Sequence, residues 1–188
     1  MLSQTIVRPY AYLKIQHHSK WVVDWGIPLI LAILITLITG LGDLYSEKHL
    51  SWKFLEDNIA SLAGILPGFY IAALAAIVAF NRNDIDEHMP EPTPIIKDYL
   101  GDIISLTRRR FLALTFSFLT AESITLMILI GLGPSLSSII EHLINNERLS
   151  TGMWYGYIFI LYTIFSQLVT VTFLCLYYLG ERLHQPDP

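Results

Sequence analysis

Four long apolar runs constrain this chain more than any other feature. Residues 26–42, 59–80 and 153–179 contain no charged side chain, and residues 111–131 contain one, Glu122. A helix of about 20 apolar residues crosses a hydrocarbon core about 30 Å thick. Because unpaired backbone amides are costly in lipid, runs of this length must be helical. The sequence therefore predicts an all-α polytopic membrane protein with four transmembrane helices.

The rest of the chain consists of short connecting segments. We expect one membrane domain over 1–188, with spans at 26–44, 59–80, 111–131 and 153–179, outer loops at 45–58 and 132–152, and inner segments at 1–25, 81–110 and 180–188. None of these segments is long enough to bury a core of its own. Only 15% of the residues are charged, against about a quarter in soluble domains. A separate soluble enzyme domain is therefore excluded.

The basic residues predict the orientation. Nine of the 12 lysines and arginines lie in the N-terminal segment, the central loop and the tail, and only Lys48, Lys53 and Arg148 lie in the other two loops. Lysine and arginine are retained on the cytoplasmic side of a membrane. Both ends of the chain are therefore expected inside.

Three connecting segments carry apolar residues at helical spacing, which predicts short amphipathic helices at the membrane surface. The N-terminal segment, with Tyr10 and Leu13, is interpreted as an interfacial helix or a partner-docking arm. The other two sets are Ile96, Tyr99, Leu100, Ile103 and Ile104 in the inner loop, and Leu136, Ile139, Ile140, Leu143 and Ile144 in the second outer loop. Arg108, Arg109 and Arg110 are expected to anchor the third span at anionic headgroups.

The second span has a line of small residues: Ala60, Gly64, Gly68, Ala72 and Ala76 recur every four positions. Such a line lets another helix approach closely, either inside the chain or at a subunit interface. Pro67 beside Gly68 predicts a kink or local break near the middle of the span.

Glu122 is the main candidate for a functional side chain. It lies near the middle of the third run, with Gln167 at a similar depth in the fourth and Tyr70 in the second. A carboxylate at that depth is costly unless it is paired, hydrated or protonated. One alternative is a protonated acid, hydrogen-bonded inside the bundle, that only fixes helix register. The other is a ring of carboxylates around an oligomer axis, as in cation pores.

No other pattern indicates chemistry. Asp84, Asp86, Glu87 and His88 include metal-ligand types, but their spacing matches no calcium loop, and a solvated charged stretch is the preferred interpretation. The sequence has no phosphate loop, nucleophile elbow or zinc-protease motif, so we expect no catalytic residue, metal or cofactor. The net charge of −4 argues against direct nucleic-acid binding. The single cysteine, Cys175, can form no intrachain disulfide.

The order of the motifs resembles a known family. The second span ends in Ala79-Phe80-Asn81-Arg82, an acidic proline-rich loop covers 86–94, and the chain continues through Leu106-Thr107-Arg108-Arg109-Arg110-Phe111 to a C-terminal Leu176-Tyr177-Tyr178-Leu179-Gly180-Glu181-Arg182. From the second span onward this is similar to the small four-span KwaA proteins of the bacterial Kiwa antiphage system. The resemblance implies an inner-membrane protein that senses membrane disturbance at infection. It also implies a homo-oligomer, expected to be a tetramer, and a cytoplasmic DNA-binding effector, KwaB, as partner.

The leading functional hypothesis is therefore an antiphage membrane sensor that recruits or regulates a cytoplasmic effector. The expected docking loop comprises Asp86, Glu87, His88, Pro90, Glu91, Pro92 and Pro94. The alternative is an oligomeric ion-conducting pore lined by Glu122. An intramembrane enzyme is the third hypothesis and the weakest, because only one buried acid was found and no second catalytic group.

Overall fold

The computed structural model describes residues 7–45, 50–79, 85–97, 102–144 and 146–180. Four helical stretches are long and apolar enough to cross a membrane: Val22–Tyr45, Ser51–Ala79, Arg108–Leu143 and Glu147–Gly180. The predicted all-α class and the four span-sized helices are confirmed.

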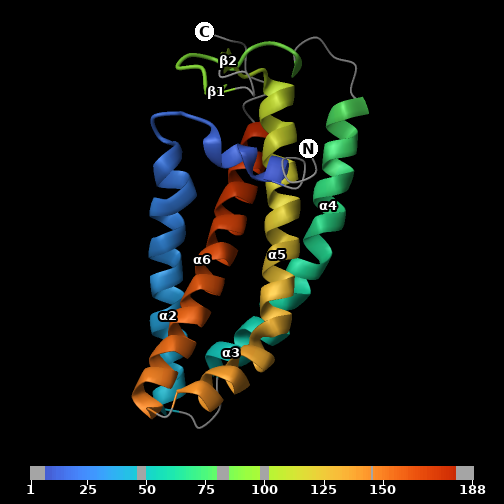
Figure 1. The fold of residues 1–188 in the computed structure, drawn as a ribbon. Coiled ribbons are helices and arrows are strands. Elements are labelled where there is room, and N and C mark those ends of the chain that lie inside the picture. Colours follow the sequence, from blue (N-terminus) through green and yellow to red (C-terminus); the bar gives the residue numbers. More distant parts are fainter. Residues whose placement is uncertain (1–6, 46–49, 80–84, 98–101, 145, 181–188) are drawn as a thin grey trace.

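The helical stretches are built from named elements (Figure 1). The first is a π-helical turn, η2 (Val22–Gly26), followed by α2 (Ile27–Tyr45). The second runs from α3 (Leu50–Phe54) through the π-helical η3 (Leu55–Ile59) into α4 (Ala60–Ala79). The third and fourth are α5 (Arg108–Leu143) and α6 (Glu147–Gly180), and a 3₁₀ helix, η1 (Arg8–Lys14), precedes them all.

The long helices form a row rather than a closed bundle. The order across the row is α2, α6, α5, α4, because α2 packs on α6, α6 on α5, and α5 on α4 (Figure 1). The two inner helices hold most of the fully buried side chains, such as Leu119 and Leu126 of α5 and Leu161 and Leu168 of α6. Many apolar side chains of the outer helices are exposed, including Ile38 of α2 and Phe69 and Val78 of α4. The row therefore presents wide apolar surfaces, as lipid or a second copy of the chain would require.

The helices extend well beyond the predicted spans. α5 has 36 residues, which is about 54 Å of helix, so the expected outer loop 132–152 is largely helical. The segment 136–143, expected to form a separate surface helix, is the end of α5. Figure 1 shows α5 bending in this part, which contains Pro134. The expected loop 45–58 is also helical from Leu50 onward.

Pro67 does not break its helix, because α4 is continuous from Ala60 to Ala79. A proline removes only one backbone donor, and the remaining hydrogen bonds of a 20-residue helix can hold the helix together. The departure from α-helical geometry lies instead at η3, before Ala60.

The amphipathic helix predicted over 96–104 is wrong. Ile95–Lys97 (β1) pairs in antiparallel register with Ile103–Ser105 (β2), so that Ile96 lies opposite Ile104. Isoleucine is a strong strand former, and the preceding prolines hold the chain extended. Tyr99 and Leu100 lie outside the described residues. We call the end of the molecule that carries β1 and β2 the hairpin end. The opposite end is the one where α5 ends at Leu143 and α6 begins at Glu147 (Figure 1).

The described part of the N-terminal segment forms a short 3₁₀ helix, η1. η1 packs along α5 with Tyr12 turned inward: Tyr12 is 0% exposed and its ring is stacked 4.9 Å from that of Phe118, whereas Arg8 and Lys14 are exposed. Of the two apolar residues expected on its face, Tyr10 packs against the core and Leu13 is 40% exposed, so the interfacial or docking role of this segment stays a prediction.

Candidate functional site

A buried polar cluster lies where η1, η2, α5 and α6 meet. Asp24 of η2 is its centre and is 3% exposed. The Tyr12 hydroxyl donates to Oδ1 of Asp24 at 2.9 Å, and the Lys20 ammonium is paired with Oδ2. The Gln167 amide of α6 donates to the backbone oxygen of Asp24 at 2.9 Å. Asp24 therefore joins the N-terminal segment, the first span and the fourth span.

Lys20 is held on two sides. Its ammonium group lies 4.0 Å from the centre of the Tyr12 ring in addition to its contact with Asp24. Burial lowers the pKa of Lys20, although the hydrogen bond to Asp24 acts in the opposite direction. Burial is also the main cause of the raised pKa of Tyr12, so its hydroxyl stays protonated and remains a donor. The charges of Lys20 and Asp24 therefore compensate each other inside the protein, where water contributes little.

Glu122 lies in the same region but takes no part in the hydrogen bonds of the cluster. It is 4% exposed, and its Oε2 has no hydrogen-bond partner among the described residues. The predicted grouping with Gln167 and Tyr70 is not the observed one: Gln167 bonds to Asp24, and the hydroxyls of Tyr70 and Thr172 lie 2.7 Å apart. The chain itself therefore encloses Glu122, and the side chains expected to satisfy it are engaged elsewhere.

The cluster shows that the first span starts further from the hairpin end than the ends of α5 and α6 that lie there. Asp24 lies in the first turns of the first span, whereas Glu122 is 14 positions after Arg108 in α5, which is about 21 Å of helix. Towards the hairpin end, α5 and α6 therefore continue past the start of the first span. η1 packs on α5 around the level of Glu122, with the Tyr12 ring stacked on Phe118 and the Tyr10 hydroxyl 2.8 Å from Oγ1 of Thr125.

Sequence reasoning missed Asp24, Lys20 and Tyr12. Lys20 and Asp24 are four positions apart just before an apolar run, and this i,i+4 spacing of opposite charges is the signal from which the pair could have been predicted. Hydropathy places the start of the span after Asp24, so both residues fall in the inner segment 1–25, which is interpreted as an interfacial helix or docking arm. The burial of Tyr12 depends on contacts with distant residues such as Phe118, so a local sequence pattern could not predict it.

The hairpin end is tied to the helices by two of the three predicted arginine anchors. Nε and Nη2 of Arg109 donate to the two oxygens of Asp86 at 2.6 and 3.0 Å, and Nη1 donates to the backbone oxygen of Ile77 at 2.6 Å. Arg109 thereby joins the end of α4 to the loop and to α5, and lowers the pKa of Asp86 through these hydrogen bonds. Arg108 is only 5% exposed and lies 3.7 Å from Glu87. Arg110 is exposed.

The expected docking loop has a definite structure. Its backbone pairs with the strand that leads into α5, through Met89 N to Leu106 O, Leu106 N to Pro94 O, and Arg108 N to Glu87 O, at 3.0–3.1 Å. Pro94 is buried and Pro90 half-buried, whereas Asp86, Glu87, His88, Glu91 and Pro92 are exposed. Asp86 and Glu87 contact arginines, so Glu91 and His88 are the polar members that face outward without a described side-chain contact of their own.

The small-residue line lies on the outside of the row. Gly64, Gly68, Ala72 and Ala76 are exposed, and Ala60 is half-buried. The face of α4 that packs on α5 consists of other residues, including Ala63, Tyr70 and Ile77. Of the two predicted roles, packing inside the chain is therefore not observed.

No group of three or more histidine, cysteine, aspartate or glutamate residues gathers in the described part of the chain, and Asp84 lies outside it. No protein-family model, curated protein or solved structure matches this sequence or this fold.

Proposed function

We propose that this chain is a membrane-embedded subunit, assembled from several copies, whose hairpin end docks a partner inside the cell. The observation that carries the proposal is the hydrogen-bonded backbone of the hairpin end. The loop pairs with the chain that leads into α5 and contacts Arg109 through Asp86, and Glu91, Lys97 and Asp102 are exposed. A docking surface needs a preorganised backbone with outward side chains, because binding then costs little ordering entropy.

The excess of basic residues at this end supports a cytoplasmic hairpin end. The assembly into oligomers is supported by the open row of helices and by the exposed line at Gly64, Gly68 and Ala72, because small residues allow close helix approach in lipid. The antiphage role, the bacterial inner membrane, the KwaB-like effector and the tetramer rest on the resemblance to KwaA proteins.

Affinity purification of the full chain from membranes of its host tests the docking surface. The wild type is compared with Glu91→Lys/Asp102→Lys at the hairpin end and with Glu141→Lys/Glu147→Lys at the opposite end; all four residues are exposed. We expect one co-purifying soluble protein to be lost with the first variant and retained with the second. Retention of every co-purifying protein in both variants would remove the hairpin end as the docking surface.

A further inference from the structure

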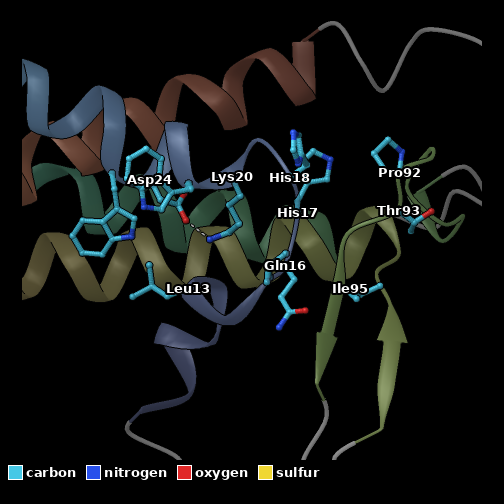
Figure 2. Close-up of a pocket in the computed structure, with 12 residues that line it drawn as sticks. Leu13, Gln16, His17, His18, Lys20, Asp24, Pro92, Thr93 and Ile95 are labelled. Carbon is cyan, nitrogen blue, oxygen red and sulfur yellow. Dashed lines mark hydrogen bonds and ion pairs between the residues drawn. The ribbon is translucent and has the colours of Figure 1, made fainter.

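A cavity of about 560 Å³ opens beside the start of the first span at the hairpin end (Figure 2). Three separate segments form its walls: the stretch after η1 with His17 and His18, the beginning of the first span with Lys20 and Trp21, and the loop before β1 with Thr93. The volume lies within the range of small-molecule pockets.

The walls are held in place by backbone pairing. Gln16 N donates to Ile95 O at 2.9 Å, and Ile95 N donates to Gln16 O at 3.2 Å. This short antiparallel bridge fixes the N-terminal segment to β1 on one side of the cavity. The opening is therefore part of the folded chain and not a gap between independent segments.

The polar lining is rich in donors. The Ser19 N–H donates to Nδ1 of His17 at 3.4 Å, which leaves Nε2 of the same ring as the nitrogen available to donate to a ligand. His18 and the ammonium group of Lys20 add further N–H groups. Among the described residues that line the cavity, Asp24 is the one carboxylate, and it already accepts from Tyr12 and Lys20. The pocket therefore offers donors to an anion and little competing negative charge.

The apolar lining continues along the membrane-facing side of the first span. Trp21 is 67% and Trp25 43% exposed at the edge of the pocket. Below them, Ile27, Ile30 and Leu34 of α2 are exposed in turn. Exposed tryptophans are typical of the headgroup level of a membrane, with acyl chains beyond them.

We propose that this cavity binds the phosphate-bearing headgroup of an anionic phospholipid, with its acyl chains lying along Trp25 and the exposed face of α2. The phosphate accepts from His17, His18 and Lys20, and the exposed apolar face distinguishes a lipid from a free phosphate ion. Because the same cavity is bounded by Thr93 and Ile95, a bound headgroup contacts both the first span and the hairpin end.

Native mass spectrometry of the full chain in detergent tests the site. Phosphatidylglycerol and phosphatidylcholine with identical acyl chains are titrated against wild type, His17→Ala/His18→Ala and His142→Ala. His142 is an exposed histidine at the opposite end of α5 and is the matched control. Circular dichroism and gel filtration establish that each variant is folded.

We expect wild type and His142→Ala to prefer phosphatidylglycerol, and the double variant to bind it about tenfold more weakly, as loss of charge-assisted hydrogen bonds predicts. Equal binding of the two lipids to the wild type, or an unchanged preference in the double variant, would overturn the proposal. Displacement of phosphatidylglycerol by an equal concentration of inorganic phosphate would also overturn it, since the pocket would then recognise the anion alone.

Discussion

Replacing Asp24 by asparagine removes the charge at the centre of the buried cluster and almost nothing else. Asparagine has the same shape, and its side-chain oxygen can still accept from the Tyr12 hydroxyl that now lies 2.9 Å from Oδ1. The donation from Gln167 goes to the backbone of Asp24 and is unaffected. The variant therefore isolates the ion pair with Lys20.

The expected loss is large because the remaining charge stays buried. Removing one partner of a buried ion pair costs about 3–5 kcal/mol. The side chain of Lys20 is 11% exposed, so some water reaches it, and we take the lower limit of about 3 kcal/mol. For chains of about 150–250 residues, 1 kcal/mol shifts the unfolding midpoint by about 2–4 °C, so we expect Tm to fall by about 6–12 °C.

Thermal unfolding of the full chain in detergent, followed by gel filtration, measures the loss. The double variant Lys20→Met/Asp24→Asn removes both charges and should recover at least half of the lost stability, because no unpaired ion remains. An Asp24→Asn protein that unfolds with the wild type would refute the ion pair. A double variant as unstable as the sum of its single variants would show that the two side chains do not interact.

The contribution of the Lys20–Asp24 pair to the free energy of unfolding should change with pH in a direction that can be measured. Burial lowers the pKa of Lys20 below its ordinary value of 10.5, so in the window just below 10.5 the folded chain binds fewer protons than the unfolded chain. Stability from this group therefore rises as the pH rises through that window and is lower at neutral pH. The stability difference between wild type and Asp24→Asn should become smaller from pH 7 towards pH 10, because a neutral Lys20 needs no counter-ion.

Three further predictions concern other parts of the fold. A side chain at Gly133 would overlap the ring of Trp52, so Gly133→Ala should lower stability by about 1–3 kcal/mol, and Trp52→Leu in the same chain should restore part of it in the same unfolding assay. Arg109→Gln removes the contacts between α4, the loop and α5, so limited proteolysis should cut the loop several times faster than in wild type, with the helices intact. In a background lacking the native cysteine, Lys97→Cys should react with an impermeant maleimide only from the cytoplasmic side and Glu141→Cys only from the other; labelling of both from one side would contradict the proposed orientation.

The long helices were predictable because hydropathy depends on composition rather than on tertiary contacts. A run of 20 apolar residues has one stable backbone arrangement in lipid, so the four spans follow from the sequence. Their true ends do not, because polar helix extends beyond the apolar runs. Residues 136–143 have an amphipathic pattern that is equally consistent with a surface helix and with the last turns of α5, and only packing decides between them.

The hairpin was missed for a different reason. Ile96, Ile103 and Ile104 fit a helical period of 3.6. However, four isoleucines in two adjacent pairs also fit two short strands, and the sequence Gly101-Asp102 between the pairs is typical of a turn. The strand pairing is supported from outside the segment, by Gln16 bridging Ile95 and by Met89 bonding Leu106. Such partners are distant in sequence, so a local pattern could not include them.

The two buried acids, Asp24 and Glu122, show what the position of a carboxylate relative to an apolar run can predict. Hydropathy singled out Glu122 because it interrupts an apolar run, and it passed over Asp24 because Asp24 precedes one. In the fold, Asp24 pairs with Lys20, accepts from Tyr12 and is joined to α6 through Gln167. Oε2 of Glu122, in contrast, has no described hydrogen-bond partner. The carboxylate that organises the site is therefore the one at the start of a span, where the N-terminal segment can reach it. A carboxylate deep in a helix has only neighbouring helices to satisfy it, and here those neighbours are already engaged. For this chain, the N-terminal segment is thus an integral part of the membrane domain, and a variant that lacks Tyr12 to Lys20 should lose the whole cluster around Asp24.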